Sequence, residues 1–93
     1  MFAHEIKKGQ LVRSRQGRDK DKYYIIYDWD NEYVYVVDGY TRTVQSPKKK
    51  NLRHLWYTKK VDYELNKRIM KNEKVSNADI RETLNGLFET LDD

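Results

Sequence analysis

The sequence predicts a mainly β protein whose helices are confined to its C-terminal third. Residues 22–29 and 33–37 are dominated by β-branched and aromatic side chains, which suit a pleated strand and crowd a helix. From residue 61 the apolar residues recur at every fourth position, which is typical of a helix with one buried face. We therefore expect a small, twisted antiparallel sheet followed by helices.

Five strands are expected, at residues 10–14, 22–29, 33–37, 40–44 and 52–55. Side chains alternate between the two faces of a strand, so Leu11 and Val12 should point to opposite sides of the sheet. A tight turn at residues 30–32 joins the second strand to the third. Pro47 has no N–H for a strand ladder, so it should end the fourth strand and leave residues 48–51 as a loop.

Two helices are expected after residue 60. The first is predicted from three apolar residues at intervals of four: Val61, Leu65 and Ile69. After a break at residues 71–74, Ser76 is a suitable N-cap with Asp79 three residues later. The second apolar stripe consists of Ile80, Leu84, Leu87, Phe88 and Leu91. We expect a helical hairpin packed on the sheet, and the alternative is a helix that docks in a groove of another protein.

The composition describes a single domain with a thin core and a heavily charged surface. Hydrophobic residues make up 38% of the 93 residues and charged residues 37%. The absence of cysteine excludes disulfides and cysteine-ligated metals and fits a reducing compartment. No secretory signal and no bilayer-spanning apolar run is visible, so we expect a soluble cytoplasmic protein without a membrane partner.

Positive charge is concentrated in the part of the chain predicted to form strands. Residues 1–59 contain 13 Lys and Arg against 7 Asp and Glu, whereas residues 60–93 contain 6 against 8. A basic face suits a polyanion, because neutralising phosphates releases condensed counterions. The alternative explanation of the charge is solubility alone.

Two basic segments and several aromatic residues are candidates for contact with nucleic acid. The loop at residues 15–21 combines Arg and Lys with Gly17, and backbone N–H groups near a glycine can cradle a phosphate. The alternative is a mobile, solvent-exposed hairpin tip. The lysine run at residues 48–50 is the densest charge run, and such a run is usually only a solvated loop. Trp29 and Tyr40 lie beside predicted turns, where an exposed ring could stack on an unpaired base.

The segment 8–58 resembles the KOW motif family of small RNA-associated domains, found in ribosomal proteins and in elongation factors of the NusG type. Five matching stretches carry the resemblance: residues 8–12, 17–20, 23–26, 36–39 and 51–55. The last two are similar to small KOW proteins related to a large-subunit ribosomal protein of archaea and eukaryotes. This chain has Asp21 where many relatives have a glycine after the loop lysine.

The resemblance implies an SH3-like β-barrel at residues 1–59, with a C-terminal helical extension at residues 60–93 packed on it. It also implies a non-catalytic protein that binds RNA, in particular ribosomal RNA, and is associated with the ribosome and translation. The alternative is a protein-interaction module that docks on ribosomal, other translation or transcription proteins. The expected RNA-binding residues are Lys8, Arg13, Arg15, Gly17, Arg18, Lys20, Lys22, Trp29, Tyr40, Arg42, Lys48, Lys49, Lys50, Arg53 and His54.

No arrangement of residues typical of an enzyme is visible in the sequence. It contains no phosphate-binding P-loop, no nucleophile elbow and no metal-binding spacing of His. His54 has no Cys, His or carboxylate cluster near it in sequence, so a structural or RNA-facing role is expected. We therefore expect no cofactor, no metal and no small-molecule substrate.

Overall fold

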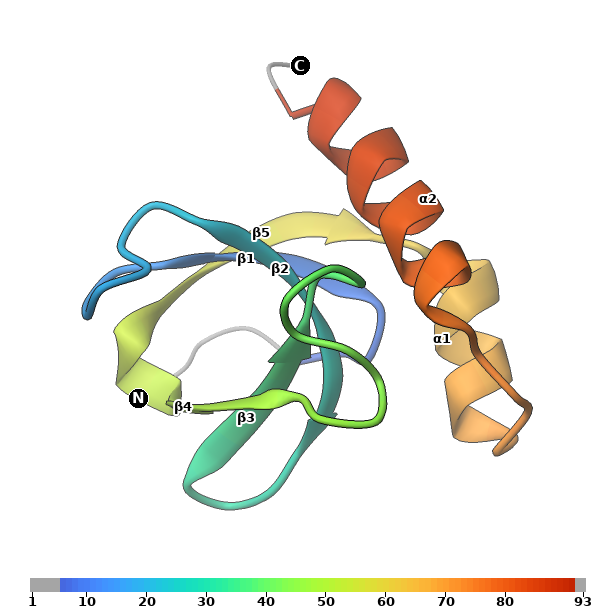
Figure 1. The fold of residues 1–93 in the computed structure, drawn as a ribbon, viewed down its shortest axis with the longest axis horizontal. Helices are drawn as coiled ribbons and strands as arrows, with labels where there is room; N and C mark the ends of the chain where they lie inside the picture. The colour runs from blue at the N-terminus through green and yellow to red at the C-terminus, as the bar shows by residue number, and fades with distance from the viewer. Residues whose placement is uncertain (1–5, 92–93) are drawn as a thin grey trace.

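The computed structural model describes residues 6–91, which form one five-stranded antiparallel sheet and two helices (Figure 1). The strands are β1 (Gln10–Ser14), β2 (Tyr23–Trp29), β3 (Tyr33–Val37), β4 (Lys48–Asn51) and β5 (Leu55–Val61). The helices are α1 (Tyr63–Met70) and α2 (Asn77–Glu89), and a short 3-10 helix, Leu52–His54, precedes β5. The predicted combination of a small antiparallel sheet with two C-terminal helices is confirmed.

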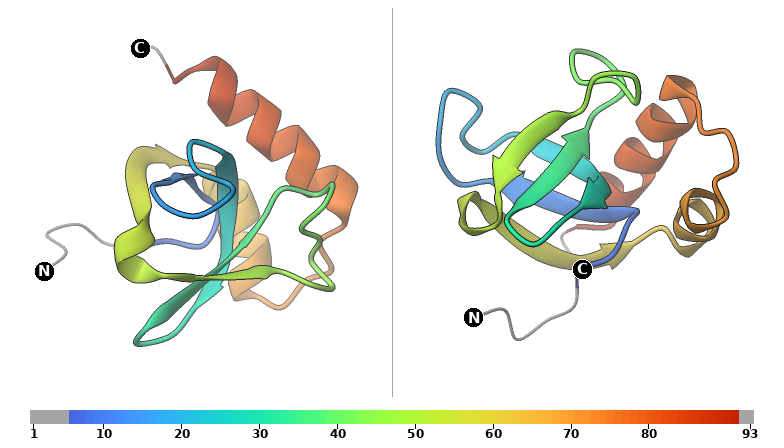
Figure 2. Two further views of the ribbon diagram at one scale, coloured as in Figure 1. Left: turned by 60° about the vertical axis from the view of Figure 1, so that its left-hand side comes forward. Right: turned by 90° about the horizontal axis from the view of Figure 1, so that it is seen from below.

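The sheet is strongly curved but open. Its strand order is β4-β3-β2-β1-β5, so β4 and β5 are its two edges (Figure 2). The pairing register shifts between Gln10 and Val12 on β1 and between Ile26 and Asp28 on β2. Such bulges bend a sheet and increase its twist. In the described part of the chain the sheet does not close into a barrel, so of the predicted SH3-like β-barrel the structure shows the small antiparallel sheet.

The chain between β3 and β5 differs most from the prediction. Residues 40–44 form no strand, because the Asp38 carboxylate accepts hydrogen bonds from the N–H groups of Tyr40 and Arg42 and turns the chain there. The fourth strand instead begins just after Pro47 and contains the lysine run, which pairs with β3. Most of the predicted strand at residues 52–55 is the 3-10 helix, and only its last residue belongs to β5.

Apolar side chains pack on both sides of the sheet, as the alternation of Leu11 and Val12 predicts. The helix-side core contains Leu11, Ile25, Val37, Leu65, Ile69, Val75 and Ile80. The inner core, enclosed by the curvature of the sheet, contains Val12, Tyr24, Ile26, Val34, Val36 and Leu55. Both cores are small, so polar groups must complete the packing at their margins.

Both helices begin at a capping side chain. Asp62 caps α1 by accepting hydrogen bonds from the N–H groups of Glu64 and Leu65, and Val61 belongs to β5 and not to the first helix as predicted. Ser76 is the predicted N-cap of α2, and it forms a capping box with Asp79. The chain reverses between the helices, and α2 then runs along β1 and β2 (Figure 1). Within residues 6–91, neither helix has the length and apolar character needed to cross a bilayer.

Candidate nucleic-acid interface

The basic loop between β1 and β2, residues 15–22, is folded back onto the strands that it joins. The N–H of Asp21 donates to the carbonyl of Ser14 at 2.8 Å, and the N–H of Ser14 donates to the carbonyl of Lys22 at 2.8 Å. Asp21 has a φ of +75°, in the left-handed region that favours glycine. Its carboxylate accepts a hydrogen bond from Arg13 at 2.9 Å. The loop is therefore held by its own backbone bonds and is not an unsupported hairpin tip.

Asp19 anchors this loop to the end of β4. Its carboxylate accepts hydrogen bonds from the hydroxyls of Ser14 at 2.9 Å and Tyr24 at 2.7 Å. Lys50 lies 3.1 Å and Lys48 3.3 Å from the same carboxylate. Burial alone would raise the pKa of Asp19, but the bonds from these four side chains outweigh it and hold that pKa far below its ordinary value. We call Ser14, Asp19, Tyr24 and Lys50 the buried ion cluster.

The lysine run points to two opposite sides because it lies on a strand. Lys48 and Lys50 face the inner core, and Lys50 is only 6% exposed. Its ammonium donates to Ser14 Oγ, the Gln16 carbonyl and Asp19. Lys49 points to the other face, with its ammonium 4.1 Å from the centre of the Tyr33 ring. Lys50, which was predicted to contact RNA, is thus buried with its charge already paired, unlike the exposed members of the predicted set.

A second carboxylate, Asp38, holds the turn that follows β3. Lys22 lies 2.7 Å from it and also donates to Thr41 at 3.1 Å. Burial opposes ionisation of Asp38, but Lys22 and the N–H groups of Arg42 and Tyr40 outweigh this effect and lower its pKa to about 2. The Asp38 turn brings Arg42, which is far from the basic loop in sequence, next to that loop.

These anchors leave a hollow lined by four basic side chains between the loop, the Asp38 turn and β4. Its volume is about 530 Å³, and it is lined by Arg18, Asp19, Lys22, Tyr24, Thr41, Arg42 and Lys48. We call it the basic hollow. Lys22 and Lys48 are paired with carboxylates. Arg18 and Arg42 make no side-chain hydrogen bond or ion pair to any described residue, so their charges are open to an anionic ligand.

Trp56 is an aromatic candidate that sequence reasoning missed. It lies on β5 opposite Arg13, is 42% exposed, and has the guanidinium carbons of Arg13 and Arg15 5.0 and 5.4 Å from its ring centre. Arg13 also lies over Tyr23, whose ring meets that of Phe88 edge to face. The only signal in the sequence was a tryptophan in an alternating strand, and that strand was predicted to end at residue 55.

The remaining predicted residues are divided among several places. Lys8 and Trp29 lie together at the end of β2 that is farther from the basic loop, with the ammonium 5.6 Å from the ring centre. Tyr40 is exposed, and its ring faces Arg81 of α2. Lys20 is exposed on the basic loop beside Gly17. The structure therefore brings the loop, Arg42 and β4 together, but not Lys8 and Trp29.

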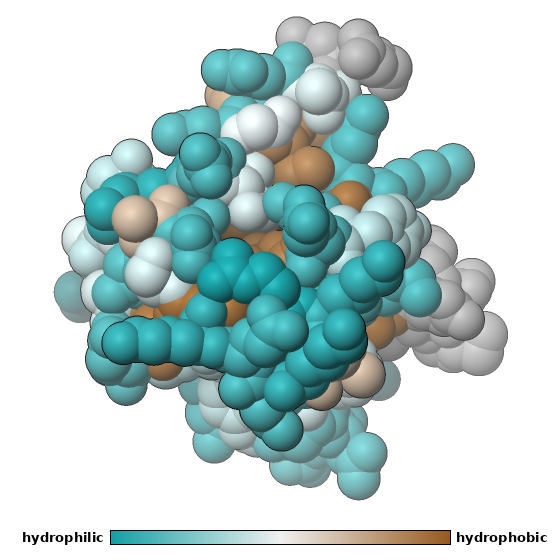
Figure 3. All heavy atoms as spheres, turned by 90° about the vertical axis from the view of Figure 1, so that its right-hand side faces the viewer, coloured by the Kyte–Doolittle hydropathy of each residue, from teal (hydrophilic) through white to brown (hydrophobic). Residues whose placement is uncertain are grey.

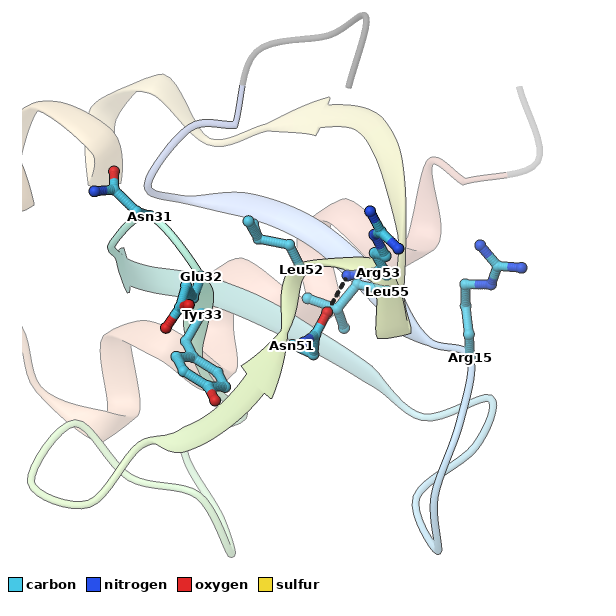
Figure 4. Close-up of a pocket in the computed structure, with 8 residues that line it drawn as sticks. All are labelled: Arg15, Asn31, Glu32, Tyr33, Asn51, Leu52, Arg53 and Leu55. Atoms are coloured by element: carbon cyan, nitrogen blue, oxygen red, sulfur yellow. Dashed lines mark hydrogen bonds between the residues drawn. The ribbon is translucent and has the colours of Figure 1, made fainter. Parts of the chain in front are cut away.

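A second hollow lies on the other side of the basic loop (Figure 4). Its volume is about 600 Å³, and it is lined by Arg15, Asn31, Glu32, Tyr33, Asn51, Leu52, Arg53 and Leu55. We call it the turn hollow. His54 is half-buried beside it, and its carbonyl accepts a hydrogen bond from the N–H of Arg15 at 2.8 Å.

A scan against protein-family models finds no match to this chain, and a search of curated proteins finds none either. The KOW resemblance therefore stays a prediction. Within residues 6–91, no group of three or more His, Cys, Asp or Glu side chains is placed to hold a metal ion.

Proposed function

We propose that this protein is a non-catalytic RNA-binding protein and that the basic hollow is its main contact with phosphates. The observation that carries the proposal is the position of Arg18 and Arg42. Both line one hollow, and neither is neutralised by a described residue. Arginine suits this role because its planar guanidinium can hold a phosphate through two parallel hydrogen bonds.

The surroundings of these two arginines support the proposal further. Lys22 and Lys48 add positive charge at the same hollow, although each also forms an ion pair with a carboxylate. The loop is held by the buried ion cluster, so Arg18 starts from an ordered backbone and less conformational freedom is lost on binding. An electropositive hollow of this kind binds a phosphate backbone without requiring a particular sequence.

The finer assignment to a KOW-type, SH3-like domain is part of the proposal. Three of the five stretches that carry the resemblance fall on β1 with its leading turn, on the basic loop and on β2. The other two fall on the end of β3 with the Asp38 turn and on the 3-10 helix with its flanking residues. Asp21, which stands where many relatives have glycine, adopts a φ of +75°, a conformation that glycine would favour. Ribosomal RNA is the proposed ligand class, and cosedimentation with large ribosomal subunits in mild salt is the corresponding test.

The competing function is docking on another protein through the helices. Ile80 is fully buried, and Leu84 and Leu87 pack against the helix-side core, so most of the apolar stripe of α2 is already used. Figure 3 shows the helix side as mostly hydrophilic, with hydrophobic residues in separate patches. This arrangement favours RNA over a helix-in-groove partner.

The test compares two double variants that remove the same charge from different places. Arg18→Ala with Arg42→Ala should weaken binding to a stem-loop RNA and lower the slope of log affinity against log salt by about two, one for each lost phosphate contact. Lys67→Ala with Lys74→Ala removes two exposed charges from the helical part and should change neither quantity much. Equal losses in both variants would mean that net charge alone drives association, and the proposed site would be wrong.

A further inference from the structure

The turn hollow has opposite charges at its two ends. Glu32 lies in the turn between β2 and β3 and Tyr33 begins β3, whereas Arg53 and Arg15 lie toward the other side (Figure 4). Glu32 and Arg53 make no side-chain hydrogen bond or ion pair to the described residues. The basic hollow, in contrast, has four basic side chains and only the already paired Asp19. The two hollows therefore suit different parts of a ligand.

The carboxylate end of the turn hollow has a fixed backbone. Asp30 accepts hydrogen bonds from the N–H groups of Glu32 and Tyr33, both at 2.9 Å, and from the hydroxyl of Tyr35 at 2.9 Å. The carbonyl of Glu32 accepts a bond from the N–H of Leu52 at 3.3 Å, which ties the turn to the 3-10 helix. Three chain segments thus hold the hollow in shape without using the Glu32 carboxylate.

An aromatic ring and an amide lie beside this carboxylate. Tyr33 and Asn51 are direct partners on β3 and β4, so their side chains lie on the same face of the sheet. The Lys49 ammonium covers one face of the Tyr33 ring and adds positive charge there, so a base would stack on the opposite face. Asn51 already uses its side-chain oxygen to accept a bond from the N–H of Arg53, which leaves its NH₂ group as a donor.

We propose that the turn hollow binds one unpaired guanine nucleotide of the RNA, which rests on the RNA-binding function proposed above. An ionised carboxylate only accepts hydrogen bonds. Guanine presents two adjacent donors, N1–H and N2–H₂, that match the two oxygens of Glu32. Adenine and cytosine present a single amino group on that edge, and uracil presents a single ring N–H. Arg53 and Arg15 then bind the phosphate, and the volume of about 600 Å³ is in the range of small-ligand sites.

The charge pattern argues against an isolated anion as the ligand. A free phosphate or an acidic peptide would gain from Arg15 and Arg53 but would be repelled by the exposed carboxylate of Glu32. A nucleotide avoids this conflict because its base donates hydrogen bonds at one end and its phosphate accepts them at the other. The proposal therefore assigns base recognition to the turn hollow and backbone attraction to the basic hollow.

The experiment uses the full chain and fluorescence anisotropy of a labelled oligouridylate with one central guanine. The same oligomer with inosine, adenine or uracil at that position completes the set, because inosine lacks only the N2 amino group. We expect guanine to bind at least about fivefold more tightly than adenine, with inosine between them. Glu32→Gln should bring the guanine-to-adenine ratio close to one, although absolute affinity rises with the loss of a negative charge. Glu89→Gln, which changes another exposed glutamate on α2, should keep the ratio.

The possible results separate this inference from the function on which it rests. Binding that depends on Arg18 and Arg42 but shows no guanine preference overturns the turn-hollow assignment and leaves RNA binding in place. A guanine preference that survives Glu32→Gln overturns it as well. If neither the oligomers nor a stem-loop RNA binds, both proposals are wrong. Circular dichroism of each variant shows that the fold is kept, which is expected because Glu32 and Glu89 are exposed.

Discussion

The buried ion cluster and the basic hollow lie side by side, but they differ in how their positive charges are paired. Lys50 is 6% exposed, and its ammonium has three oxygen acceptors. Arg18 and Arg42, a short distance away, make no side-chain bond to a described residue. A basic residue here can thus either stabilise the fold through a buried ion pair or stay available to a ligand. The presence or absence of polar partners within the protein distinguishes the two roles.

The largest expected effect comes from breaking the cluster. Asp19→Ala leaves the Lys50 ammonium buried without its carboxylate, so the free energy of unfolding should fall by about 3 to 5 kcal/mol. Urea denaturation measures this change. Asp28→Ala is the matched control, because Asp28 is exposed and its ion pair with Lys8 should contribute less than about 1 kcal/mol.

A double variant sharpens this prediction. Asp19→Leu with Lys50→Met removes both buried charges together and should recover much of the stability that Asp19→Ala loses. If the double variant is as unstable as Asp19→Ala, the bonds from Ser14 and Tyr24 to Asp19 matter more than its pairing with Lys50.

Acid should weaken the cluster and the Asp38 turn together. Asp19 and Asp38 both have pKa values below the ordinary value of 3.8, and that of Asp38 is about 2. A lowered pKa in the folded state stabilises the protein above the unfolded-state pKa, and this contribution is lost as the pH falls through the folded value. The urea midpoint should therefore drop between about pH 4 and pH 2. Asp19→Asn should show a shallower drop than the wild type, and an unchanged drop would contradict the role of Asp19.

A smaller effect is expected from Tyr24→Phe. The Tyr24 hydroxyl donates to Asp19 at 2.7 Å, and losing a hydrogen bond to a charged group costs about 2 kcal/mol. Its ring stays in the inner core, so the fold should be kept. Affinity for a stem-loop RNA should change little once the protein is folded, and a large loss of affinity would mean that the cluster itself contacts RNA.

The smallest effect on stability is expected at the hollow. Arg18→Ala removes an exposed side chain without a described partner, so the free energy of unfolding should change by less than about 0.5 kcal/mol. RNA affinity should fall nonetheless. The variant thus tests RNA binding without changing stability, whereas Asp19→Ala changes stability as well. A clear loss of stability in Arg18→Ala would instead mean that Arg18 helps to hold the fold.

Local patterns predicted much of this fold. The strands Gln10–Ser14 and Tyr33–Val37 were predicted with their observed bounds. In Tyr33–Val37 the reason is clear, because its tyrosines and valines suit a pleated strand. The N-cap at Ser76 was also predicted, since Ser76 and Asp79, which form the cap, lie only three positions apart. These features depend on neighbours in sequence.

The errors arose where distant residues decide the structure. Three consecutive lysines after a proline do not resemble a strand, but pairing with β3 and the contact of Lys50 with Asp19, 31 positions earlier, make them one. The same tertiary contact buries Lys50, which was one of the residues predicted to contact RNA. Arg18 and Arg42 could be selected as basic candidates, but their convergence on one hollow depends on the Asp38 turn.

The most direct test of the account is an NMR titration of the labelled protein with a stem-loop RNA that has no unpaired guanine. We predict that the largest shift changes fall on the backbone amides and side-chain N–H signals of Arg18 and Arg42 and on the amides of Thr41 and Lys48, all at the basic hollow. The amide of Lys67 on α1 should stay unchanged. Shifts centred on the helices, with Arg18 and Arg42 unaffected, would contradict the claim that the basic hollow is the RNA contact.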